Sequence, residues 1–123
     1  MRDERPAPTS RGSTTGVNRR RHARAAVASK ARLLIETPQG LATLSGYVLD
    51  ISVSGCALRL QVRVDAHLAG RVQLPISGQD VWLPIVTRWA RQDSRGWTVG
   101  AEFDRPTREK QELVRRFVWS RLQ

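Results

Sequence analysis

Arginines crowd into a short segment near the N-terminus of this 123-residue chain. Arg20 and Arg24 stand in an R-x-x-x-R spacing, with Arg19 and Arg21 beside them. In an extended segment this four-residue step spans at most about 13 to 14 Å, enough for two guanidinium groups to grip a nucleotide-sized anion. Each guanidinium can form paired hydrogen bonds with phosphate oxygens or with O6 and N7 of guanine. The alternative, which a basic run alone favours, is a solvated tail or a nonspecific nucleic-acid arm.

A second polar pattern, D-x-S-x-x-G, is formed by Asp50, Ser52 and Gly55 at the end of an expected strand. If the chain is still extended there, Asp50 and Ser52 lie on one face and present a carboxylate beside a hydroxyl. Gly55 permits a bend and a close approach of the backbone to a ligand. A carboxylate can accept the paired N–H groups of a guanine edge. Alone, the pattern favours an ordinary turn in which Asp50 and Ser52 cap backbone amides.

The charge of the chain points to an anionic ligand. The formal net charge is +10, from 21 Lys and Arg against 11 Asp and Glu, and 19 of the basic residues are arginines. Residues 1–32 alone carry +7. Arginine favours planar, bidentate recognition of phosphate or guanine over diffuse charge.

Several classes of protein are excluded or disfavoured. Cys56 is the only cysteine, which rules out an intrachain disulfide and a cysteine-based zinc site and favours the cytoplasm. Two histidines leave few members for a metal site or a nucleophile–base pair, so we expect no enzyme. No stretch approaches the ~20 apolar residues of a membrane span, so we expect no membrane insertion.

The pattern along the chain predicts one domain after a tail. Residues 1–18 are rich in Pro, Gly, Ser, Thr and charge, and are expected to form a flexible basic tail. Residues 19–26 form a basic arm of the single domain 19–123. Short apolar runs separated by turn formers predict six strands, at residues 27–36, 41–51, 55–64, 71–76, 81–91 and 97–103.

Within these strands, Cys56, Leu58 and Leu60 alternate with more polar neighbours, and Tyr47, Leu49 and Ile51 are expected to share a face. The last apolar stripe changes to a helical period and predicts a helix over about residues 106–121. The expected fold is therefore all-β with a C-terminal helix: a six-stranded antiparallel β-barrel whose helix packs on the sheet or plugs one end.

The two motifs, in this order around the first two strands, closely resemble the PilZ domain family. That family has a six-stranded antiparallel barrel with a C-terminal helix, and many members bind the bacterial second messenger cyclic di-GMP. The stretch from Trp97 to Phe103 is similar to the last strand of the family. The resemblance covers roughly residues 18–121.

The resemblance implies roles for the motif residues. Arg20 and Arg24 would grip guanine and phosphate, Asp50 and Ser52 would bind a guanine edge or neighbouring polar groups, and Gly55 would shape the turn. An arginine directly before R-x-x-x-R accompanies binding of two stacked cyclic di-GMP molecules in this family.

Three further residues complete the expected ligand-binding set. Arg19 occupies the place before the motif, so two molecules per chain are expected, with Arg21 as an auxiliary contact. Trp89 could offer a ring near the ligand, although a strand tryptophan more often packs. No other cofactor is implied.

The hypothesis is a cyclic di-GMP receptor whose arm orders on binding and signals to an unidentified protein partner. One alternative is a nonspecific nucleic-acid-binding barrel. It leaves D-x-S-x-x-G unused, and Asp50 would repel a phosphate backbone. Another is a PilZ-like adaptor that acts only through protein contacts, against which the intact motifs argue.

Overall fold

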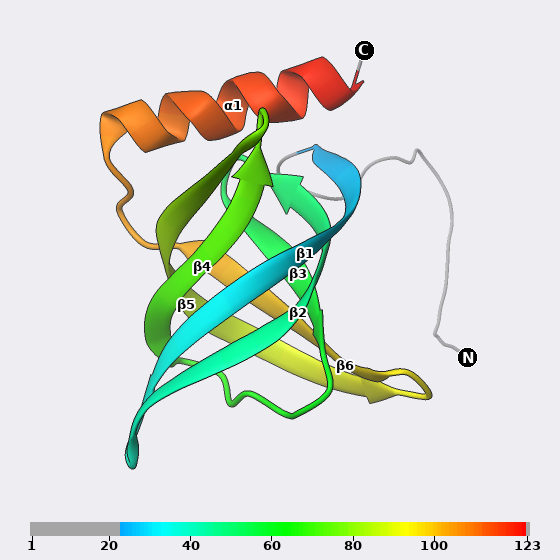
Figure 1. Ribbon diagram of the computed structural model, residues 1–123, viewed down its shortest axis with the longest axis vertical. Helices are drawn as coiled ribbons and strands as arrows, with labels where there is room; N and C mark the ends of the chain where they lie inside the picture. The colour runs from blue at the N-terminus through cyan, green and yellow to red at the C-terminus, as the bar shows by residue number, and fades with distance from the viewer. Residues whose placement is uncertain (1–22, 123) are drawn as a thin grey trace, which may run out of the picture.

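The computed structural model describes residues 23–122, which form six strands and one helix (Figure 1). The predicted tail 1–18 and the arm residues Arg19, Arg20 and Arg21 lie outside the described residues. The elements are β1 (Arg24–Thr37), β2 (Gly40–Ser52), β3 (Gly55–Leu60), β4 (Ala69–Ile76), β5 (Gln79–Asp93), β6 (Gly96–Phe103) and α1 (Arg108–Leu122).

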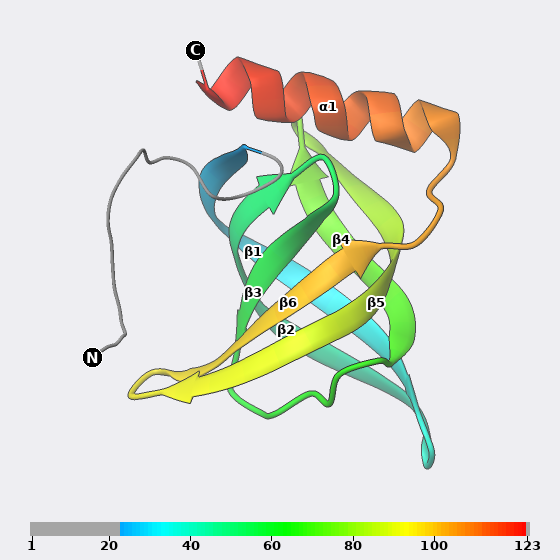
Figure 2. The same cartoon turned by 180° about the vertical axis from the view of Figure 1, so that it is seen from behind.

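The strands close into a barrel in the order β1-β2-β3-β6-β5-β4, and β4 pairs back to β1. Every pairing is antiparallel. Figure 2 shows β5 and β6 side by side, extending beyond the barrel as a long hairpin. The predicted six-stranded antiparallel barrel with a C-terminal helix is confirmed. Among the described residues, no helix has the length and apolar character needed to cross a bilayer.

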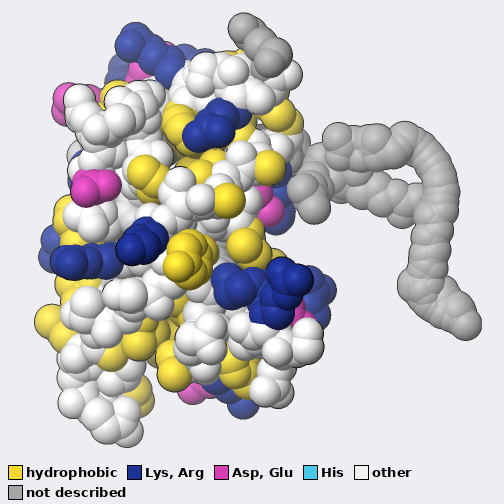
Figure 3. Space-filling view, turned by 45° about the vertical axis from the view of Figure 1, so that its right-hand side comes forward, with side chains coloured by type: hydrophobic (Ala, Val, Ile, Leu, Met, Phe, Trp, Pro, Cys, Tyr) yellow, Lys and Arg dark blue, Asp and Glu magenta, His cyan; other side chains and the backbone are white. Residues whose placement is uncertain are grey.

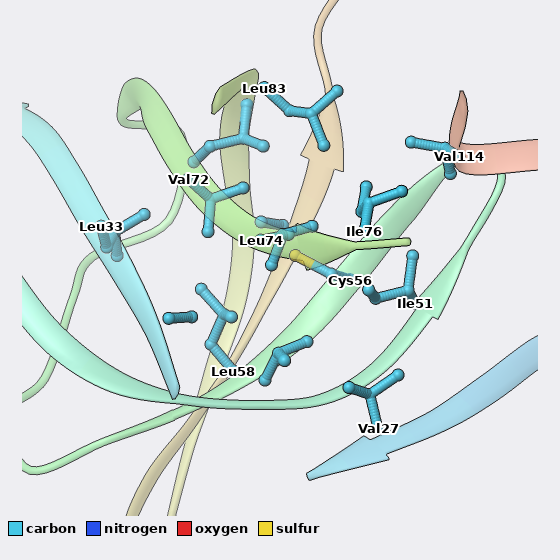
Figure 4. Close-up of a cluster of buried hydrophobic side chains, with 14 of the residues drawn as sticks. Val27, Leu33, Ile51, Cys56, Leu58, Val72, Leu74, Ile76, Leu83 and Val114 are labelled. Atoms are coloured by element: carbon cyan, nitrogen blue, oxygen red, sulfur yellow. The ribbon is translucent and has the colours of Figure 1, made fainter. Parts of the chain in front are cut away.

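The core fills the inside of the barrel and the space beneath α1. Inward side chains from several strands are fully buried, among them Leu33, Ile51, Leu58, Leu74 and Leu83 (Figure 4). Burying one such side chain contributes roughly 1.5 to 3 kcal/mol. The helix lies across one end of the barrel (Figure 1) and buries Val114, Phe117 and Val118. The helix therefore covers the end of the barrel where β1 begins and β2 ends.

Most element boundaries differ from the prediction by one or two residues, and the start of β1 and the end of β3 differ by more. β1 begins at Arg24, three residues earlier than expected, because residues 24–26 pair with the end of β2. The last part of the expected arm 19–26 thus belongs to the barrel. β3 ends at Leu60 because its partner strand starts at Gly96 and offers no further neighbour. The helix occupies 108–122 and not about 106–121.

A bulge in β2 overturns the predicted facing of its side chains. The register with β3 shifts between Val48 and Asp50, so Val48 and Ile51 both face the core and are 0% exposed. Tyr47, expected on the same face as Ile51, is 52% exposed. The extra residue rotates the strand at this point, as bulges do.

Candidate functional site

The two ends of the β1–β2 hairpin bring together one residue from each motif. Arg24 opens β1 and pairs with Ser52, while Asp50 pairs with Ala26 near the end of β2. Arg24 Nη1 lies 3.5 Å from Asp50 Oδ1. Both side chains remain partly exposed, so this ion pair is a modest stabilising contact.

One carboxylate oxygen of Asp50 has no hydrogen-bond donor among residues 23–122. This atom, Oδ1, is buried. A carboxylate oxygen without a hydrogen bond is costly to bury, since it has lost its water and gained no donor. The geometry therefore leaves room for a donor that the described part of the chain does not supply.

Ser52 shapes the turn that follows β2. Its Oγ accepts the backbone N–H groups of Ser54 and Gly55, both at 3.2 Å, and the residue is 4% exposed. For Ser52 the structure thus shows the backbone capping that an ordinary turn would use. Asp50 makes no such cap among the described residues, and the two motif residues have different surroundings.

Gly55 allows β3 and β6 to come close together. A Cβ atom on this glycine would lie 2.2 Å from the carbonyl oxygen of Ala101. The close approach seen at this glycine is to the neighbouring strand, and the predicted approach to a ligand stays a prediction.

A groove of about 340 Å³ joins most of the predicted site residues that the structure describes. Arg24, Ser52, Gly55 and Trp89 all line it. Asp50 adjoins it through its ion pair with Arg24. The groove runs over the outer surface of β3, β6 and β5, close to the start of β1.

Trp89 reaches the groove because of a bulge. The β5–β6 register shifts between Thr87 and Trp89, so Thr87 faces the core at 0% exposure while Trp89 turns outward and is 39% exposed. The ring then lies against Gly100 of β6, where a Cβ would stand 2.2 Å from Trp89 Cε2. Regular alternation would have sent Trp89 into the barrel.

Cys56 lies beneath the groove, and its thiol belongs to the core. Burial raises its pKa to about 12, and the nearby Asp50 carboxylate adds to this, against a lowering by Arg24. The thiol is therefore protonated at neutral pH and is a weak nucleophile.

Sequence reasoning missed an ion pair on the rim. Arg88 Nε donates to Glu102 Oε1 at 2.7 Å, and both residues line the groove. Arg88 is the bulged residue of β5, and Glu102 lies on the neighbouring β6. Only the register reveals this pair, because neither residue belongs to a recognisable motif.

A larger hollow of about 690 Å³ borders the groove and shares Ser54 and Glu102 with it. It lies between the β2–β3 turn and the first turns of α1, and contains neither Arg24 nor Asp50.

Basic side chains form several separate clusters on the face shown in Figure 3, some beside acidic ones. The meeting of both motifs therefore singles out the smaller groove as the candidate site.

Comparison with solved structures shows the fold. The inhibitor of motility MotI/DgrA of Bacillus subtilis has 18% identity and a TM-score of 0.64, over 86% of this chain and 52% of that one. The PilZ domain of YcgR from Escherichia coli, solved with cyclic di-GMP, has 12% identity and a TM-score of 0.63. The match covers 85% of this chain and 92% of that domain. The PilZ domain of CeSA from a cellulose-synthesizing bacterium has 14% identity and a TM-score of 0.62. The match covers 82% of this chain and 99% of that domain.

This chain spans about half the length of MotI/DgrA, and nearly all of the two isolated domains. No curated protein matches the sequence. The sequence model of the PilZ domain matches residues 18–119, a stretch that contains both motifs and all six strands. The chain therefore belongs to the PilZ domain family.

Proposed function

We propose that this chain is a cyclic di-GMP receptor that binds its ligand in the groove between Arg24, Asp50 and Trp89. The observation that carries the proposal is the buried Oδ1 of Asp50, which has no hydrogen-bond donor among the described residues yet lies 3.5 Å from a guanidinium. A guanine edge presents two N–H donors that suit this carboxylate. A phosphate beside it suits Arg24.

The ligand class follows from the mixed charge of the site. A bare polyanion would be attracted by the arginines and repelled by Asp50. A ligand that has both guanine N–H groups and phosphates satisfies both residues. Cyclic di-GMP has this combination, and the YcgR domain of the same fold was solved with this ligand. The fully buried Ser52 supports the site through its turn.

The N-terminal arginines extend the site in this proposal. Arg20 lies four residues before Arg24 in the motif, and Arg19 and Arg21 flank it. We propose that these three side chains close over the ligand and that Arg19 supports a second, stacked molecule. Planar cations can stack on guanine and offset the added phosphate charge. The ordered arm would then present a new surface to a protein partner in the cytoplasm.

Titration calorimetry of arginine variants tests the proposal. Arg20→Ala should weaken cyclic di-GMP binding by about 10-fold or more, the loss of one charge-assisted contact. Arg11→Ala is the matched control, because it removes the same charge outside the motif. Equal affinities of the two variants would contradict a specific arm. A stoichiometry of one ligand per chain would contradict the stacked pair.

A further inference from the structure

Arg91 does not line the groove itself, but it lies over Trp89, which does. Its guanidinium lies over the Trp89 ring, 5.6 Å from the ring centroid. Within residues 23–122 it has no carboxylate in ion-pair distance, whereas Arg24, Arg59 and Arg88 face Asp50, Asp93 and Glu102. Arg91 therefore offers its N–H donors to an outside acceptor while its plane is held by a ring.

The position of Arg91 depends on a stack of contacts that begins in the backbone of β6. Gly100 lacks the Cβ that would stand 2.2 Å from Trp89 Cε2, so the indole can lie directly against the strand. The bulge at Arg88 turns Trp89 outward, and the next outward residue of β5 is Arg91, paired with Thr98. Gly100 thus positions the Trp89 ring, and the ring positions the guanidinium of Arg91.

We infer that Arg91 is a further ligand-binding residue of the groove, which takes a phosphate of the cyclic dinucleotide, with Trp89 and Gly100 as its positioning residues. The inference rests on the proposed function. A guanidinium that is already stacked loses less rotamer freedom when it binds, so its contact with phosphate is stronger than that of a free surface arginine. No carboxylate within residues 23–122 pairs with Arg91, so a phosphate of the ligand can accept its N–H groups.

The chain offers a matched control for this residue. Arg63 also lies over a tryptophan ring, 5.7 Å from the centroid of Trp97. Trp97 does not line the groove, whereas Trp89, the ring beneath Arg91, does. Arg63→Ala and Arg91→Ala therefore remove the same charge and the same kind of stacking contact. Only the second removes a donor beside the groove.

Calorimetric titration with cyclic di-GMP tests the inference. Arg91→Ala should weaken binding by about 10-fold, and Arg91→Lys by less, since lysine keeps the charge but loses the fork. Arg63→Ala should stay within about 2-fold of wild type, because it leaves the groove intact. Equal effects of Arg91→Ala and Arg63→Ala would overturn the inference while leaving the proposed function in place. A wild-type chain that does not bind would overturn both.

The positioning role has its own readout. In a Trp89→Ala background, Arg91→Ala should cost clearly less affinity than in wild type, because the stack is already gone. Gly100→Ala should reproduce part of the Trp89→Ala loss by displacing the ring, provided that thermal unfolding shows a folded barrel. Additive losses from Trp89→Ala and Arg91→Ala would contradict the stack.

Discussion

The guanidinium of Arg24 and the carboxylate of Asp50 face each other across the open end of the β1–β2 hairpin, with 3.5 Å between Nη1 and Oδ1. The contact leaves Oδ1 buried and without a hydrogen bond among the described residues. This acceptor without a donor, beside a guanidinium, is the feature that we connect to ligand binding.

Replacing Asp50 should separate binding from stability. We expect Asp50→Ala to leave the free energy of unfolding unchanged or to raise it, because the partly exposed ion pair contributes little and the buried Oδ1 has no hydrogen bond among residues 23–122. Affinity for cyclic di-GMP should fall by about 10- to 100-fold through loss of charge-assisted hydrogen bonds. Chemical denaturation and calorimetry measure the two quantities. Asp65→Ala, which breaks the exposed pair with Arg63, is the control that should leave both nearly unchanged.

Gly55 should be sensitive to the smallest added side chain. A methyl group there meets the Ala101 carbonyl oxygen, so β3 and β6 must move apart. We expect Gly55→Ala to lower the free energy of unfolding by roughly 1 to 3 kcal/mol, the usual range for overpacking. Thermal unfolding followed by circular dichroism measures the loss. An unchanged melting temperature would show that the two strands tolerate the methyl group and that the close approach is not required.

The Cys56 thiol should make stability fall at high pH. Its pKa is raised from 9.0 to about 12 by burial, so the folded state favours the neutral thiol. This contribution is fully present below pH 9 and is lost as pH rises toward about 12. Above pH 9, wild type should lose up to about 1.4 kcal/mol per pH unit more than Cys56→Ala does. Parallel pH profiles of the two proteins in urea unfolding would contradict the assignment.

The barrel was predictable because its strands repeat short apolar patterns. Cys56, Leu58 and Leu60 face the core as their alternation predicted. The pattern failed where a bulge inserts a residue, because alternation carries no record of register. This is why the prediction that Tyr47 shares a face with Ile51 was wrong.

The candidate site was predictable only in its motif residues. Arg24, Ser52, Gly55 and Trp89 line one groove, and Asp50 adjoins it. The contact of Trp89 with Gly100 arises from the β5 bulge and from strand pairing, which connects residues distant in the chain, so no local pattern could have found it.

The most direct test of the account is a calorimetric titration of the wild-type chain with cyclic di-GMP at near-physiological salt, with GTP and duplex DNA titrated in parallel. We predict saturable binding of cyclic di-GMP, with two molecules per chain, and much weaker binding of the other two. Absence of binding, or equal binding of cyclic di-GMP and duplex DNA, would contradict the claim that Arg24 and Asp50 form a guanine-specific site. Equal binding of GTP would contradict selectivity for the cyclic dinucleotide.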